Sequence, residues 1–99
     1  DTNICRVDGI IVLDIKGRLD TANARDFTIA IQPLLQEDKP NIIVNCEQMS
    51  YISSSGLRCF LILQKSVQKN QGSLIIEAMR PEIKNIFEMT GCTSLFNIR

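Results

Sequence analysis

Histidine is absent from this chain of 99 residues. Its absence excludes Ser-His and Cys-His nucleophile pairs, and it removes the commonest general base and the commonest transition-metal ligand. Glycine-rich phosphate loops are lacking too, because Gly72 and Gly91 stand alone. We therefore expect no catalytic residue, no metal site and no cofactor, and we expect that the protein is not an enzyme.

An excess of charge and long apolar runs are also missing. The chain has 11 basic and 11 acidic residues, so nothing indicates a surface for nucleic acid or anionic lipid. No apolar run approaches the roughly 18 residues of a membrane span, and the polar start from Asp1 to Asn3 is unlike a signal peptide. We expect a cytoplasmic chain that lacks a few residues before Asp1. We also expect it to bind neither nucleic acid nor a membrane, and to recognise its partner by shape.

The four cysteines have neither the spacing of a redox pair nor that of a zinc ribbon. Three of them sit inside apolar-rich runs, which is typical of buried free thiols in a reducing compartment. An enzyme hypothesis stays open on Cys46 or Cys59 as a nucleophile, or on Glu47 as an acid or base. Apolar surroundings disfavour it, because they raise the pKa of a thiol.

An N-terminal hairpin is predicted by two apolar-rich runs, 4–7 and 10–16, that flank Asp8-Gly9. Both turn residues tolerate the positive φ that a type I′ turn requires. The odd-numbered residues from 11 to 15 are apolar and alternate with more polar ones, as in a strand with one covered face. We expect this hairpin at the edge of a sheet.

A helix is predicted after Gly17, with Asp20 or Thr21 as its cap and an early end or kink at Pro33. Its expected apolar face consists of Ala24, Phe27, Ile31, Leu34 and Leu35. The further expected elements are strands at 42–44, 74–76 and 95–98, a helix at 57–69, and a helix from Pro81 that ends before Gly91. The order β-β-α-β-α-β-α-β predicts an α/β fold with a mixed sheet, helices packed on it, and one domain over 1–99.

Three stretches carry a resemblance to a known family. They are the run from Asn45 to Leu57, the stretch Gly17-Arg18-Leu19-Asp20 with Ala24, and the stretch from Arg80-Pro81 to Gly91 with Leu95-Phe96. Together they resemble STAS domains of the anti-sigma factor antagonist type. The serine loop of that family reads Asp-Ser-Ser-Gly-Leu or Asp-Ser-Thr-Gly-Leu, so the resemblance implies a STAS-like fold and places Ser53 where the family has aspartate.

The resemblance also implies a function. The serine that the family phosphorylates falls on Ser54. The implied protein is an anti-sigma factor antagonist, a regulator of transcription by partner switching. It binds an anti-sigma factor that resembles a serine kinase, releases a sigma factor, and is inactivated by phosphorylation of Ser54. A PP2C-type phosphatase is a further implied partner.

Two alternatives stay open for the same residues. A serine at the start of a helix commonly caps it, so the cluster from Ser53 to Gly56 is explained without any regulation. The run from Cys59 to Leu63 is explained equally well by burial on both sides. The partner-binding hypothesis instead places Cys59 and Ile62 in a docking patch with Ser53, Ser54, Ser55 and Gly56.

A second function also stays open. The chain is then a soluble STAS subunit or a cytoplasmic regulatory domain of a membrane transporter. In that setting the serine loop docks without needing a phosphate, so the two functions differ in whether a modified Ser54 changes binding.

Overall fold

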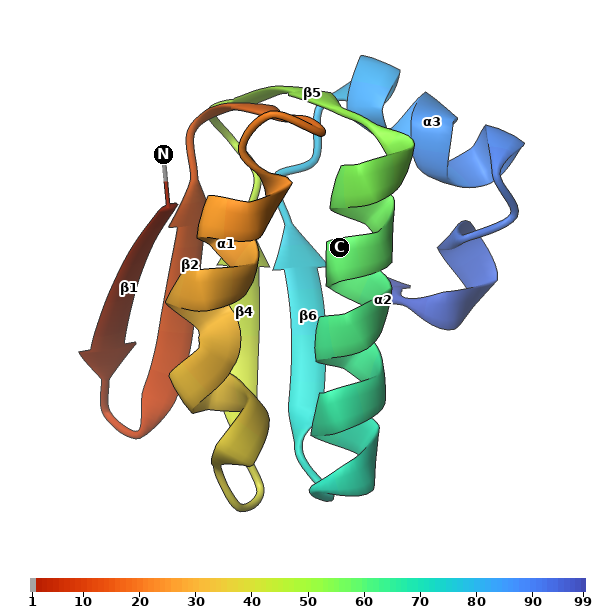
Figure 1. Ribbon diagram of the computed structural model, residues 1–99. Coiled ribbons are helices and arrows are strands. Elements are labelled where there is room, and N and C mark those ends of the chain that lie inside the picture. Colours follow the sequence, from red (N-terminus) through yellow and green to blue (C-terminus); the bar gives the residue numbers. More distant parts are fainter. Residues whose placement is uncertain (1) are drawn as a thin grey trace.

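The computed structural model describes residues 2–99, and a mixed five-stranded sheet organises them (Figure 1). The strand order is β1-β2-β4-β6-β7, with β1 antiparallel to β2 and every other neighbouring pair parallel. The strands are β1 Thr2–Val7, β2 Ile10–Ile15, β4 Asn41–Asn45, β6 Ser73–Glu77 and β7 Asn97–Ile98. This arrangement confirms the predicted α/β class.

The N-terminal hairpin is confirmed. Asp8 and Gly9 have φ values of 52° and 80°, and two successive positive values are what a type I′ turn needs. β1 is an edge strand, as expected. Ile11, Leu13 and Ile15 are buried and their neighbours Val12 and Asp14 only half-buried, so the predicted alternation is confirmed too.

Helices α1 and α2 lie side by side over one face of the sheet, whereas α3 lies beyond α2 and contacts the short strand β5 (Figure 1). The helices are α1 Ala24–Ile31, α2 Ser54–Lys69 and α3 Pro81–Met89, with 3₁₀ turns η1 at Gln32–Gln36 and η2 at Thr93–Leu95. The change from α1 to η1 at Gln32 confirms the early end predicted from Pro33, which cannot donate a helical hydrogen bond. None of the described helices is long and apolar enough to cross a membrane.

The predicted cap of the first helix is wrong. Asn23 is the N-cap residue, and neither Asp20 nor Thr21 is. The Asp20 carboxylate instead accepts hydrogen bonds from the backbone N–H groups of Ala22 and Asn23, at 3.1 and 3.3 Å. Asp20 therefore stabilises a turn that precedes the helix, a role that aspartate also fills well.

Two short strands were not predicted. β3 Gly17–Leu19 and β5 Met49–Ile52 pair in parallel as a separate two-stranded sheet. Runs of three and four residues are too short to show a strand period. The predicted start of the last strand is wrong as well, because Leu95 belongs to η2 and β7 begins at Asn97.

A chain of aromatic rings fixes the position of α2 in the core. Phe60 of α2 lies 6.0 Å from Phe27 of α1 and 5.9 Å from Phe87 of α3, measured between ring centroids. Phe96 lies 5.6 Å from Phe87 and continues the chain to the last strand. Such aromatic pairs add to the stabilisation from burial, so these contacts hold the N-terminal half of α2 against α1 and α3.

Candidate functional site

The serine loop enters α2 directly from β5, and Ser53 is the N-cap of the helix. Its Oγ accepts a hydrogen bond from the backbone N–H of Gly56 at 3.2 Å, and its own N–H donates to the Leu19 carbonyl at 2.9 Å. Serine and aspartate both supply the oxygen that a cap requires. Ser53 therefore caps the helix, as an aspartate at this position could. Of the three serines, Ser53 is the one that the capping explanation fits.

Ser54 and Ser55 differ in how free their hydroxyls are. Ser55 is half-buried, and its Oγ lies 3.1 Å from Thr21 Oγ1 in the loop before α1. Ser54 is the first residue of α2, its side chain is exposed, and its hydroxyl has no hydrogen-bond partner among residues 2–99. Of the three adjacent hydroxyls, that of Ser53 caps the helix, that of Ser55 links the first turn of α2 to the loop before α1, and that of Ser54 is exposed.

Gly56 permits a close approach between α2 and the small sheet. A Cβ at this position would lie 2.8 Å from Ile52 Cγ1 and 2.9 Å from the Leu19 carbonyl oxygen. Contacts that short require something to move, and the Leu19 oxygen belongs to the backbone. Gly56 is buried, and its lack of a side chain lets the first turn of α2 pack directly against β3 and β5.

The loop before α1 is held by Asn23, a residue that sequence reasoning missed. Its side-chain amide donates to the Arg18 carbonyl at 2.7 Å, and its Oδ1 accepts from the Asp20 N–H at 2.9 Å. Asn23 lies between Asp20 and Ala24, inside a stretch that carried the family resemblance. Its position in that stretch was the one feature of the sequence that could have indicated its role. The bridge fixes the loop that brings Thr21 to Ser55.

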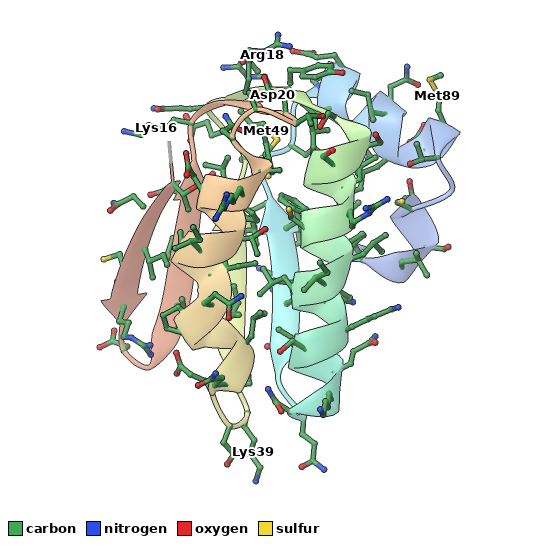
Figure 2. The ribbon with its side chains drawn as sticks, viewed as in Figure 1. Lys16, Arg18, Asp20, Lys39, Met49 and Met89 are labelled. Carbon is green, nitrogen blue, oxygen red and sulfur yellow. The ribbon has the colours of Figure 1, made fainter. Side chains whose placement is uncertain are left out.

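Arg18 and Tyr51 form the exposed rim beside the serine loop. The Arg18 guanidinium lies 4.5 Å from the centroid of the Tyr51 ring, and its Nε donates to Asp20 Oδ2 at 3.2 Å. That hydrogen bond from Arg18 is the main cause that lowers the pKa of Asp20. Arg18 and Asp20 lie at the opposite end of the molecule from Lys39 (Figure 2).

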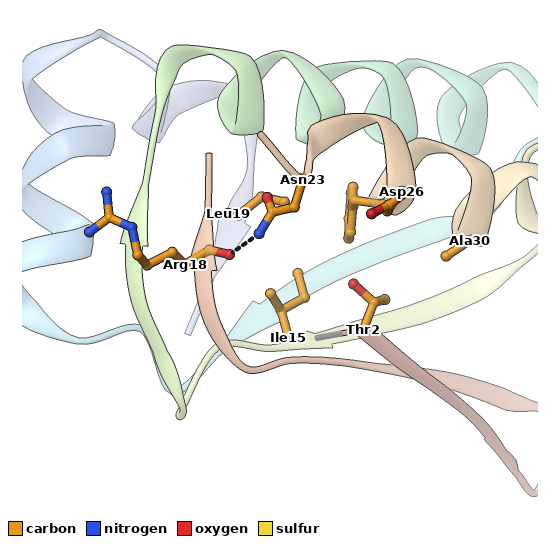
Figure 3. Close-up of a pocket in the computed structure, with 8 residues that line it drawn as sticks. Thr2, Ile15, Arg18, Leu19, Asn23, Asp26 and Ala30 are labelled. Atoms are coloured by element: carbon orange, nitrogen blue, oxygen red, sulfur yellow. Dashed lines mark hydrogen bonds between the residues drawn. The ribbon is translucent and has the colours of Figure 1, made fainter. Parts of the chain in front are cut away.

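A hollow of about 360 Å³ opens beside this loop, between α1 and the ends of β2 and β3 (Figure 3). Its lining residues are Thr2, Ile15, Arg18, Leu19, Asn23, Asp26, Phe27 and Ala30.

No group of histidine, cysteine or acidic side chains among residues 2–99 is arranged to hold a metal ion.

The predicted exposure of Cys59 is wrong. The residue is only 5% exposed, and its thiol lies 3.4 Å from Thr28 Oγ1 and 3.8 Å from the Ala24 carbonyl of the neighbouring α1. Cys59 packs between the two helices because its position on α2 faces α1. Ile62 is 41% exposed and lies on the outer side of the helix. Of the two α2 residues predicted for a docking patch, only Ile62 is therefore exposed enough to contact a partner.

The thiol of Cys46 is sequestered in the core. Cys46 is fully buried, and burial raises the pKa of its thiol to about 12. A nucleophilic cysteine needs its thiolate, so this environment disfavours the hypothesis of a reactive Cys46.

A family model described as the STAS domain matches residues 2–99. BtrV of Bordetella bronchiseptica, a protein named as an anti-sigma factor antagonist, is 26% identical over 93 residues, which cover 94% of this chain and 80% of that protein. The anti-sigma-B factor antagonist of Staphylococcus aureus is 29% identical over 91 residues, covering 92% and 84%.

Solved structures share the fold. A protein from Thermotoga maritima, also named as an anti-sigma factor antagonist, matches with a TM-score of 0.90 at 17% identity, covering 98% of this chain and 84% of that one. The phosphorylated form of SpoIIAA from Bacillus matches with a TM-score of 0.75 at 20% identity, covering 100% and 91%. The murine anion transporter Slc26a9 matches with a TM-score of 0.78 at 14% identity, but this chain covers only 16% of it.

Proposed function

Because the chain belongs to the STAS domain family, we propose that it is an anti-sigma factor antagonist that docks through its serine loop and is inactivated by phosphorylation of Ser54. Two relatives whose matches extend over more than nine-tenths of this chain are named as antagonists of anti-sigma factors, and this supports the first part of the proposal. The proposal makes the chain a binding protein that regulates transcription in the cytoplasm.

One observation carries the assignment to Ser54. The hydroxyls of Ser53 and Ser55 are engaged within the chain, at 3.2 Å from the Gly56 nitrogen and 3.1 Å from Thr21 Oγ1, whereas Ser54 is exposed at the first position of α2. A kinase that enters this loop meets the Ser54 hydroxyl without breaking a hydrogen bond. Ser54 is therefore the favoured acceptor.

A phosphate on Ser54 acts at the interface and leaves the fold intact. A phosphoserine adds roughly −1.5 to −2 charges, and negative charge at a helix N-terminus is favourable. Burying that hydrated group against a partner shaped for a hydroxyl costs several kcal/mol unless the partner supplies cations. A few kcal/mol corresponds to a hundredfold or more in affinity.

The partner in this proposal is an anti-sigma factor with serine-kinase character. Docking of the unmodified chain releases a sigma factor from it, and the kinase, which carries the ATP, then modifies Ser54. A PP2C-type phosphatase restores the active form. On the docking surface Ser54 and Ile62 are exposed for contact, whereas Ser53, Ser55 and Gly56 set the shape of the loop.

A regulatory domain of a membrane transporter is the second candidate, because a domain of the same fold occurs within the anion transporter Slc26a9. At 14% identity that likeness concerns the fold alone. This candidate needs no phosphate on Ser54, so the response to a charge at that position separates the two functions.

Calorimetry with purified kinase-like anti-sigma factors from the same genome tests the proposal. Wild type, Ser54→Ala and Ser54→Asp serve as ligands, and Ser94→Asp is the matched control, because Ser94 is also exposed but lies in η2. We expect one anti-sigma factor to bind wild type, Ser54→Ala and Ser94→Asp alike and to bind Ser54→Asp at least about tenfold more weakly. Equal affinity for Ser54→Asp and wild type would contradict the switch.

A further inference from the structure

The charges of the chain are distributed unevenly, because α2 holds three of the 11 basic residues and none of the 11 acidic ones. The three are Arg58, Lys65 and Lys69, and all are exposed. The ion pairs found among residues 2–99 involve other arginines, so these three cations form no ion pair within that part of the chain.

The three cations lie along one side of the helix. At 3.6 residues per turn, Arg58, Lys65 and Lys69 fall within about 40° of arc, and Ser54 and Ile62 border the same side. The stripe runs roughly 22 Å from Ser54 to Lys69. We call this stripe the cationic face of α2.

The opposite side of α2 packs against the rest of the domain. It carries Leu57, Phe60, Leu63 and Val67, which are buried in the core. An amphipathic helix that binds a bilayer needs its apolar side for the lipid, and here that side is already packed. The exposed side offers cations and little apolar surface, which suits an acidic protein surface.

We propose that the cationic face of α2 is a second part of the docking surface and binds an acidic surface of the same partner. The inference rests on the proposed function, because it takes Ser54 as the point where the partner engages the loop. The contact extends from Ser54 past Arg58 and Ile62 to Lys65, with charge guiding association and the serine loop providing the switch.

The spacing of Ser54 and Arg58 gives the phosphate a second effect. Side chains four residues apart are neighbours on a helix, so a phosphate on Ser54 pairs with the Arg58 guanidinium. Pairing neutralises the cation nearest the loop and weakens the attraction to an acidic partner. The modification then acts on the loop and on the cationic face together.

The test uses the anti-sigma factor that binds wild type and the variant Arg58→Gln/Lys65→Gln. The matched control Arg6→Gln/Arg99→Gln removes the same charge from the edge strand β1 and from the residue that follows the other edge strand, β7. Affinity and association rate are measured in 50 mM and 500 mM NaCl. We expect the α2 variant to bind about tenfold more weakly at low salt, mainly through slower association, and the difference to shrink below about twofold at high salt. The control should match wild type.

Each other outcome overturns a defined part of the account. If wild type binds and the α2 variant matches the control, the cationic face is not an interface and the proposed function stands. If wild type binds no anti-sigma factor, both proposals fall. If wild type binds vesicles containing 30% phosphatidylserine and the α2 variant does not, while both bind the anti-sigma factor equally, the face serves a lipid surface and this inference is wrong.

Discussion

The hydroxyls of Thr21 and Ser55 lie 3.1 Å apart and join the loop before α1 to the first turn of α2. These residues are 34 positions apart in the chain, yet their contact connects the two segments that border Ser54. The contact engages the Ser55 hydroxyl, whereas the Ser54 hydroxyl has no hydrogen-bond partner among residues 2–99.

A double-mutant cycle measures this link. Thr21→Val and Ser55→Ala each remove one hydroxyl, and we expect a coupling of about 0.5–1 kcal/mol in the free energy of unfolding. Urea denaturation of wild type, both single variants and the double variant gives the value. The cycle Thr90→Val with Ser55→Ala is the control, because the Thr90 hydroxyl bonds within its own helix end and should not couple. Strictly additive effects of Thr21→Val and Ser55→Ala would contradict the link.

Ser53→Ala should remove the helix cap. Loss of the hydrogen bond to the Gly56 nitrogen should lower the free energy of unfolding by about 1 kcal/mol. Ser53→Asp should keep the cap and be at least as stable as wild type, since aspartate also suits the helix dipole. Ser54→Ala is the control, because its hydroxyl is not engaged. Equal unfolding midpoints for Ser53→Ala and Ser54→Ala would exclude the capping role.

Much of the fold could be predicted from the sequence because its signals are local. The Asp8-Gly9 turn, the alternation along β2 and the break at Pro33 each depend on a few neighbouring residues. β3 and β5 could not be predicted, since strands of three and four residues are defined by their pairing with each other.

The candidate site could be predicted only in part. The sequence marked the serine cluster, but it could not say which hydroxyl is free, because the partners of Ser53 and Ser55 come from the folded backbone and from Thr21. The orientation of Cys59 was missed for a similar reason. Periodicity shows that α2 has apolar sides, whereas the presence of α1 beside one of them is a property of the tertiary packing.

Gly56→Ala should destabilise the protein and disturb the loop. The added methyl group would meet Ile52 and the Leu19 carbonyl at less than 3 Å, so we expect a loss of about 1–3 kcal/mol in the free energy of unfolding. Thermal and urea denaturation check the stability, and proteolysis around the loop checks its order. An unchanged unfolding midpoint would mean that α2 does not need this close approach.

The cysteines should differ sharply in reactivity. Cys5 is exposed and should react with a thiol reagent at pH 8, whereas Cys46, with a pKa of about 12, should react only on unfolding. The pKa of this thiol is 9.0 in the unfolded chain and about 12 in the folded protein. The unfolded chain therefore loses the proton first as pH rises, so the free energy of unfolding should fall between pH 9 and 12. Mass mapping of the labelled sites checks the reactivity, and fast labelling of native Cys46 would contradict it.

The proposed switch depends on Ser54 as the phosphorylated residue. Its most direct test is to incubate the protein with the anti-sigma factor that binds it and with ATP, and to locate the phosphate by mass spectrometry. Wild type, Ser53→Ala and Ser55→Ala should all be phosphorylated on Ser54 alone, and Ser54→Ala should remain unmodified. Phosphate on Ser53 or Ser55, or continued phosphorylation of Ser54→Ala within the loop, would contradict the account.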